Sequence, residues 1–256
     1  MKKLILLSFV FSLIFYNCQP KTENTIFQIS TIDALLSGVY DGNMSGNKLL
    51  DNGDLGIGTF DDLDGEMIVL NDTIFQVKAD GKVYQPNLKI ETPFASVCNF
   101  IPDTNFVLSK QLNLETLENL LDKILSNKNI FYAIKISGKF NAMHTRSVPA
   151  QEKPYPPLRE VTAHQPEFHM KNISGTIVGF RCPSFVKGVN VPGYHLHFIS
   201  NDRSKGGHIL DFDLRNARIE VDILNKFVLQ LPSNKKFKNI DLARDRSREL
   251  EEVEKK

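Results

Sequence analysis

The sequence predicts an α+β protein that is mostly β, with two sheet-based lobes and a few helices. Three observations indicate this class. Residues 50–90 form short alternating runs, a second series of strand-like runs follows residue 130, and one strong amphipathic helix lies between them. The chain has 256 residues, of which 41% are hydrophobic, so it is long enough to build a sizeable core.

The N-terminal residues have the pattern of an export signal. Two lysines precede an apolar run over residues 4–16, which is too short for a good membrane span. Cys18 follows this run and resembles the lipidation site of a bacterial lipoprotein. The alternative is ordinary signal-peptidase cleavage nearby, without lipid attachment. We expect a signal peptide over residues 1–18, a tether over 19–26, and an exported protein, periplasmic or at the cell surface.

Local periodicity predicts the first elements of the folded part. Residues 27–42 begin as a strand and continue with apolar residues at helical spacing until an Asp-Gly pair. Residues 50–90 alternate and are split by Asp-Gly and Asn-Asp pairs, which predicts a meander of hairpins. The clearest helix spans 113–129, because its apolar residues share one stripe and Asn113 can cap it.

The second half of the chain is typical of strands with short connections. The predicted strands are residues 131–140, 175–182, 193–200, 208–214 and 218–224. Residues 147–168 carry five prolines, which argues against a helix or a central strand and predicts an ordered crossing loop. We expect the boundary between the two lobes near residues 145–170. The tail over 239–256 is charged and compatible with a helix.

Charge and cysteine content restrict the function classes. The formal net charge of +1 argues against electrostatic binding of nucleic acid, which needs a concentrated basic surface. We therefore expect no nucleic-acid partner. An exported protein permits a disulfide between Cys98 and Cys182. Because sequence separation does not establish proximity, two separate buried thiols are the preferred interpretation.

Three of the six histidines lie within residues 193–208. Because side chains alternate along a strand, His195 and His197 project from one face. The turn-forming residues 200–207 send the chain back and bring His208 opposite or diagonal to His197. Three neutral imidazoles with open positions are typical of a catalytic Zn²⁺ site, although Fe, Cu, Mn and Ni also bind imidazole. The alternative is three hydrogen-bonded histidines on a polar face.

An enzyme built on this metal site needs further polar groups. Glu66 follows a turn at the start of a β-run, and Arg146 lies at the end of a strand. A guanidinium there can clamp a carboxylate through two parallel hydrogen bonds, whereas a surface salt bridge is the usual role of a single arginine. Asp211 and Asp213 have the opposite strand parity to His208, so we expect them to face away from it.

A set of motifs along the chain carries a resemblance to a known family. The motifs are "LLSGVYDG", "GDLGIGTFDDLDGEM", "FYAIKISGKF", "HTRSV", "QEKPYPP", "GTIVGF" and "GYHLHFISNDRSKGGH". Through them, residues 27–254 resemble acetolactate decarboxylase. The resemblance implies that residues 27–256 form a catalytic unit of that family.

The resemblance implies a metal-dependent active site. It implies Zn²⁺ held by His195, His197 and His208. Glu66, in "LDGEM", matches a catalytic glutamate of the family. Arg146, in "HTRSV", matches an arginine that acts in catalysis and binds the substrate.

Two further residues are implied in the same way. Thr59, in "GIGTF", matches a threonine that lies beside the substrate. A second catalytic glutamate of the family comes from the C-terminal tail and folds back onto the metal site. Glu254 is the best match, with Glu251 and Glu252 as alternative registers. The family commonly forms homodimers, so the resemblance implies a homodimer here.

The implied reaction is the decarboxylation of 2-acetolactate to acetoin and CO₂. In it, the metal chelates the ketone and hydroxyl oxygens of the substrate and stabilises an enediolate, which a glutamic acid protonates. Two other interpretations remain open. Another exported three-His zinc enzyme, such as a hydrolase, would not need Arg146, and a non-catalytic metal-binding lipoprotein would tolerate the loss of both Glu66 and Arg146.

Overall fold

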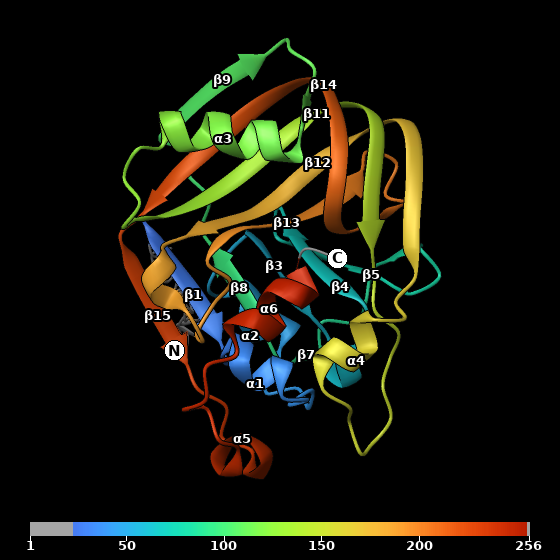
Figure 1. Ribbon diagram of the computed structural model, residues 1–256, viewed down its shortest axis with the longest axis vertical. Coiled ribbons are helices and arrows are strands. Elements are labelled where there is room, and N and C mark those ends of the chain that lie inside the picture. Colours follow the sequence, from blue (N-terminus) through green and yellow to red (C-terminus); the bar gives the residue numbers. More distant parts are fainter. Residues whose placement is uncertain (1–22, 255–256) are drawn as a thin grey trace, which may run out of the picture.

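The structure, a computed structural model, describes residues 23–254. The predicted signal peptide, Cys18 and residues 19–22 of the predicted tether lie outside the described residues. The described part is mostly β, with a seven-stranded, a six-stranded and a two-stranded sheet, which confirms the predicted class (Figure 1). No helix within residues 23–254 is long and apolar enough to span a membrane.

The seven-stranded sheet contains the predicted meander. In spatial order its strands are β15 (Lys226–Gln230), β1 (Thr25–Ile29), β8 (Ala95–Cys98), β3 (Leu55–Thr59), β4 (Glu66–Leu70), β5 (Thr73–Val77) and β6 (Val83–Tyr84). Strands β3 to β6 pair as successive antiparallel neighbours, as predicted. Strand β1 begins at Thr25, inside the predicted tether, because it is held between β8 and a parallel β15.

The six-stranded sheet is built from long strands. Its main order is β10 (Leu112–Asn113), β14 (Gly206–Leu224), β11 (Phe131–Arg146), β12 (Glu167–Cys182) and β13 (Gly193–Ser200), and β9 (Thr104–Leu108) also pairs with β14. Residues 208–214 and 218–224 were expected as separate strands, but they belong to one strand, β14. Ala217 pairs with Gly138 on one side and Leu108 on the other, so the hydrogen-bonded ladder runs through the expected break.

Residues 145–170 do not separate two lobes. Strands β11 and β12, which flank this segment, pair with each other along almost their whole length within one sheet. The chain instead passes from the seven-stranded to the six-stranded sheet between β8 and β9, and it returns at β15. Local periodicity identifies strands but not their partners, which is why the boundary was misplaced.

The proline-rich segment, for which an ordered crossing loop is expected, contains a short helix, α4 (Leu158–Thr162). Pro157 is the N-cap of this helix, and no proline lies inside it. A proline is compatible with a helix start, because the first backbone N–H groups have no partner within the helix. The remainder of the segment is irregular up to the start of β12.

The predicted amphipathic helix is α3 (Leu114–Ile124). The Asn113 side chain accepts a hydrogen bond from the backbone N–H of Thr116 at 3.0 Å, which confirms the predicted cap. Leu117 and Leu121 are fully buried in a cluster with side chains of β11 and β14, and Figure 1 shows α3 lying across that sheet. The remaining short elements are α1 (Ile32–Leu36), α2 (Gly46–Leu50), α5 (Lys235–Asn239), α6 (Ser247–Glu254), η1 (Asp61–Leu63), η2 (Ser184–Val186), β2 (Met44–Ser45) and β7 (Glu91–Thr92).

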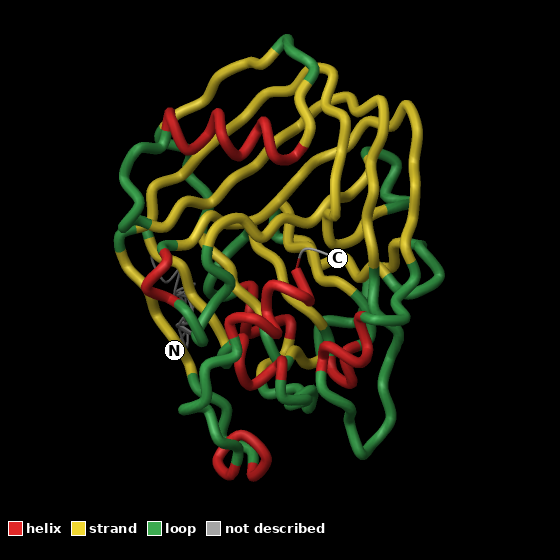
Figure 2. The backbone as a smooth tube through the Cα atoms, viewed as in Figure 1, coloured by secondary structure: helices red, strands yellow, loops and turns green. Residues whose placement is uncertain are grey.

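The two large sheets share a hydrophobic core. Ile57 and Ile68 of the seven-stranded sheet cluster with Phe180 of the six-stranded sheet, so the sheets pack face to face. Cys98 and Cys182 lie in this same cluster as free buried thiols, as expected. A separate cluster joins α1, α4 and α6, and Figure 2 shows these helices together in the lower half of the view.

Candidate active site

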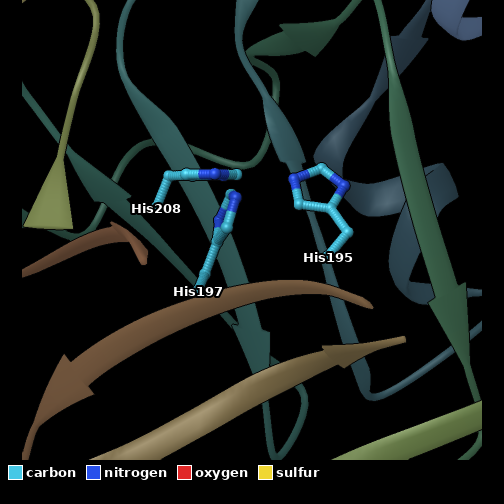
Figure 3. A group of neighbouring side chains, drawn as sticks. All are labelled: His195, His197 and His208. Carbon is cyan, nitrogen blue, oxygen red and sulfur yellow. The ribbon is translucent and has the colours of Figure 1, made fainter. Parts of the chain in front are cut away.

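Three histidines converge from the antiparallel pair formed by β13 and β14. His197 and His208 are directly opposite each other in the register, and His195 precedes His197 on the same face. The ring centroids of the three imidazoles are 5.1–5.3 Å apart, and one nitrogen from each ring lies within 4.8 Å of the others (Figure 3). The alternating pattern predicted for residues 193–208 therefore brings all three rings together.

Burial keeps these imidazoles neutral. Burial, together with the positive charge of Arg146, lowers the pKa of His195 to about 3. Burial likewise lowers the pKa of His197 and of His208 well below the usual range for histidine. A neutral imidazole has a free lone pair, which is the form that binds a metal ion.

The ring of His197 is oriented by the backbone of the neighbouring sheet. Its Nδ1 atom donates a hydrogen bond to the carbonyl oxygen of Met67 at 2.9 Å. This bond assigns the proton to Nδ1, because a carbonyl oxygen only accepts. The Nε2 atom is buried and has no hydrogen-bond partner in the structure. A buried lone pair beside two further imidazole nitrogens fits a metal ligand, and this donor set suits Zn²⁺.

Glu66 and Thr59 enter the site from the β3–β4 hairpin, where they are directly opposite each other. Glu66 is buried, and its Oε2 atom lies 3.5 Å from Nε2 of His197. The Thr59 hydroxyl donates to the carbonyl oxygen of Gly65 at 2.7 Å. Gly65 has a φ of +88°, and a Cβ atom there would lie 2.3 Å from the carbonyl oxygen of Val77. The hairpin therefore requires glycine next to Glu66.

Arg146 is the last residue of β11 and is directly opposite His208 in β14. Its side chain is buried, and its Nη1 atom donates a hydrogen bond to the carbonyl oxygen of Val253. Its Nε atom is buried and has no hydrogen-bond partner among residues 23–254. Burial lowers the pKa of Arg146, while the nearby charges of Glu254 and Glu66 oppose this effect. The guanidinium thus has polar capacity left for a substrate oxygen.

The C-terminal helix α6 contributes Glu254. Leu250 and Val253 are buried against α1 and α4, and Glu254 extends the same helical stripe because it is four residues after Leu250. The Oε2 atom of Glu254 lies 3.8 Å from Nε2 of His195 and 3.7 Å from Nε2 of His208.

The two alternative candidates in the tail, Glu251 and Glu252, have different surroundings from Glu254. Glu251 is exposed, and Glu252 forms ion pairs with Arg159 and Arg248. Of these three glutamates, the structure brings Glu254 to the histidines.

Both site carboxyls are weaker acids than usual in the metal-free protein. The pKa of Glu66 is raised to about 8, chiefly by burial, with the charge of Arg146 opposing this rise and that of Glu254 adding to it. Burial raises the pKa of Glu254 to about 7, opposed by Arg146. The site therefore holds two weak acids next to three neutral bases, which suits proton transfer near neutral pH.

A small cavity is lined by these polar groups and by apolar side chains. Thr59, Glu66, Arg146, His195, His208 and Glu254 line one part of it. The apolar residues that line the cavity include Ile32, Leu35, Phe94, Val148 and Leu158. This arrangement suits a small substrate with a polar, oxygen-rich side and short alkyl groups.

Several positions that shape the site were not identified in the sequence. The carbonyl groups of Met67 and Val253 orient His197 and Arg146, and backbone groups leave no signature in a sequence. Gly207 precedes His208 with a φ of +134°, and a Cβ atom there would lie 2.4 Å from the carbonyl oxygen of Arg146. The Gly-Gly pair before His208 was the available signal.

Asp211 and Asp213 lie away from the three histidines, as expected. Asp211 accepts a hydrogen bond from the backbone N–H of Leu114 at 3.3 Å, and Asp213 accepts one from the Gln111 side chain at 2.8 Å.

Comparisons with known proteins point to one family. The chain matches the profile described as alpha-acetolactate decarboxylase over residues 26–244. It is 48% identical over 233 residues to the alpha-acetolactate decarboxylase of Methanosarcina mazei, which covers 91% of this chain and 81% of the relative. It is 44% identical to that of Methylococcus capsulatus, over 91% of this chain and 89% of the relative.

A solved structure agrees with these matches. The crystal structure of alpha-acetolactate decarboxylase from Bacillus subtilis strain 168 superposes with a TM-score of 0.89 at 37% identity, covering 91% of this chain and 100% of that chain. The profile match ends before α6, so the assignment of Glu254 depends on the geometry described above.

Proposed function

Since this chain belongs to the alpha-acetolactate decarboxylase family and is a carboxy-lyase, we propose that it converts 2-acetolactate to acetoin and CO₂ with Zn²⁺ held by His195, His197 and His208. One observation carries the proposal. Three buried neutral imidazoles lie beside the carboxyl groups of Glu66 and Glu254, and two of these imidazoles line one cavity together with both carboxyl groups and the buried Arg146.

Zn²⁺ is proposed because the donor set consists of imidazole nitrogens and the reaction involves no change of oxidation state. A divalent cation held there supplies a Lewis acid that stabilises negative charge on substrate oxygen as the carboxylate leaves. The unpartnered Nε2 atom of His197 supports this assignment.

Arg146 binds and orients the substrate in this proposal. Its buried guanidinium lines the cavity, and one of its nitrogens has no partner within the described residues. A fixed cation of this kind holds a carboxylate or hydroxyl oxygen in one orientation. Thr59 lines the cavity beside Glu66, and its hydroxyl oxygen retains accepting capacity while its proton is donated to Gly65.

Glu66 is proposed as the proton donor. When the carbon–carbon bond to the carboxylate breaks, its electron pair moves into the neighbouring ketone and leaves an enediolate. A proton must then reach the carbon that lost CO₂. The raised pKa of Glu66 favours the protonated carboxyl, and solvent returns the proton after each turnover. Glu254, close to His195 and His208, is assigned to the metal side of the site.

The test is a turnover assay with racemic 2-acetolactate, in which acetoin and CO₂ are measured for untreated, chelator-stripped and Zn²⁺-restored protein. Activity should disappear on stripping and return with Zn²⁺. Glu66→Gln should retain Zn²⁺ but lose at least about 10²-fold in turnover, as expected for a general acid. Glu91→Gln, an exposed glutamate on β7, is the matched control. Ester hydrolysis without acetoin release by metal-replete protein would contradict the proposal.

We also propose that the chain is exported through residues 1–18, with lipid attachment at Cys18, and that it acts as a homodimer. The apolar run before Cys18 supports the first point, and the family resemblance supports the second. The mass of the mature N-terminal peptide and the light-scattering mass of the purified protein test them. An uncleaved N-terminus, or a monomer at micromolar concentration, would contradict these two points respectively.

A further inference from the structure

A second group of metal-binding side chains lies outside the active site, where β11 pairs with β12. His144 and His169 are directly opposite each other in the register of these strands. Glu167 precedes His169 by two residues, so it projects from the same face of β12. One ligand atom from each of the three side chains lies within 4.8 Å of the others. This spacing is close to that of ligands around a single ion.

The three side chains already contact one another. The Nε2 atom of His144 lies 2.8 Å from Oε2 of Glu167, and the rings of His144 and His169 stack with centroids 4.0 Å apart and planes tilted by 22°. The side chains of His144 and Glu167 are 28% and 43% exposed, so water and dissolved ions reach them. These exposures distinguish the group from the buried active-site triad.

The backbone holds the ligands in place before any ion binds. Nine consecutive residue pairs link β11 to β12 from Tyr132–Arg181 to Phe140–Ile173, and the ladder resumes from Ala142–Lys171 to Arg146–Glu167. His144 is also paired with Asp211 of β14, so its strand is held on both sides. Little backbone entropy is lost on binding, because the ligands are carried by paired strands rather than by loops.

We propose that His144, Glu167 and His169 form a second, surface site for a borderline divalent metal ion such as Zn²⁺. Two imidazoles and one carboxylate are a common donor set for such ions, and the exposed side leaves the remaining positions to water. The ion replaces the hydrogen bond between His144 and Glu167 and bonds to both partners. Because the group is open to solvent, this site is weaker than the active site.

The surface site is separated from the reaction but close to it. Glu167 is directly opposite Arg146, whose side chain is buried in the active site. An ion at Glu167 would therefore alter the electrostatic environment of Arg146, and turnover would not distinguish the two metal sites. Binding stoichiometry does distinguish them.

The test is equilibrium dialysis of the folded protein, first loaded with one equivalent of Zn²⁺, against increasing Zn²⁺, with bound metal measured by mass spectrometry. The wild-type protein should bind a second, weaker equivalent. His169→Gln and Glu167→Gln should retain the first equivalent and lose more than about tenfold in affinity for the second, since removing even an outer partner of a metal costs that much. His164→Gln removes an exposed histidine outside the group and should behave as wild type.

Two outcomes would overturn the proposal. The first is that the wild-type protein saturates at one equivalent. The second is that a second equivalent binds with unchanged affinity to both His169→Gln and Glu167→Gln. These variants change exposed side chains, and circular dichroism verifies that their fold is unchanged.

Discussion

Replacing Glu66 with Gln should change how the stability of the metal-free protein depends on pH. Burial raises the pKa of this carboxyl from 4.5 to about 8 in the folded protein. A group whose pKa is raised on folding contributes stability below its unfolded pKa, and that stability is lost as pH rises through the folded pKa. Metal-free wild-type protein should therefore lose stability between pH 4.5 and 8, whereas Glu66→Gln lacks this contribution.

The magnitude follows from the difference between the two pKa values. A difference of about 3.5 pKa units, at about 1.4 kcal/mol per unit, corresponds to at most about 5 kcal/mol. Because Arg146 and Glu254 are nearby and respond to the substitution, this value is an upper bound. It is a large share of the stability of a typical domain, so the change should be measurable.

Urea denaturation of chelator-treated protein at about pH 5 and pH 9 measures this effect. The free energy of unfolding should fall more between the two pH values for wild type than for Glu66→Gln. Glu91→Gln serves as the control, because Glu91 is exposed. An equal fall in wild type and Glu66→Gln would refute the reasoning that burial holds a proton on Glu66.

Three further predictions concern the site and its support. His197→Ala should lose bound metal and activity together, as measured by metal content and acetoin release; a metal-replete, active variant would refute the ligand assignment. Glu254→Gln should lower turnover by at least about tenfold, whereas Glu251→Gln should remain near wild type; equal activities would place a different glutamate at the histidines. Gly207→Ala should lower the free energy of unfolding by more than about 1 kcal/mol, as measured by urea denaturation. The reason is that the φ of Gly207 is +134° and a Cβ atom there would meet the carbonyl oxygen of Arg146. Unchanged stability would show that the backbone at the start of β14 relaxes.

The histidine hairpin shows which features of the structure the local sequence pattern predicts. Alternation along residues 193–200 placed His195 and His197 on one face, and the turn that follows brought His208 opposite His197. The helix predicted over residues 113–129 forms over 114–124 with the predicted Asn113 cap, for the same reason. In each case, the interaction joins residues close in sequence, so backbone periodicity and turn chemistry are sufficient.

The surface group of His144, Glu167 and His169 illustrates the opposite case. Its members lie beyond the strands predicted over 131–140 and 175–182, and nothing in their local sequence states that β11 and β12 extend this far or are partners. The misplaced lobe boundary has the same cause, since residues 145–170 were interpreted without knowing which strands they connect. The short helix α4 was missed because prolines were counted without regard to their position at its N-terminus.

The sequence by itself determined the β3–β6 meander, the amphipathic helix α3, the face occupied by each histidine of residues 193–208 and, through its motifs, the family. Only the tertiary structure brought Glu66, Arg146 and Glu254 around those histidines and selected Glu254 over its neighbours. The physical reason is that these contacts join a hairpin, a strand end and a C-terminal helix that are far apart along the chain. Their burial is also what shifts the pKa values of the carboxyl groups and imidazoles, and burial is created by packing.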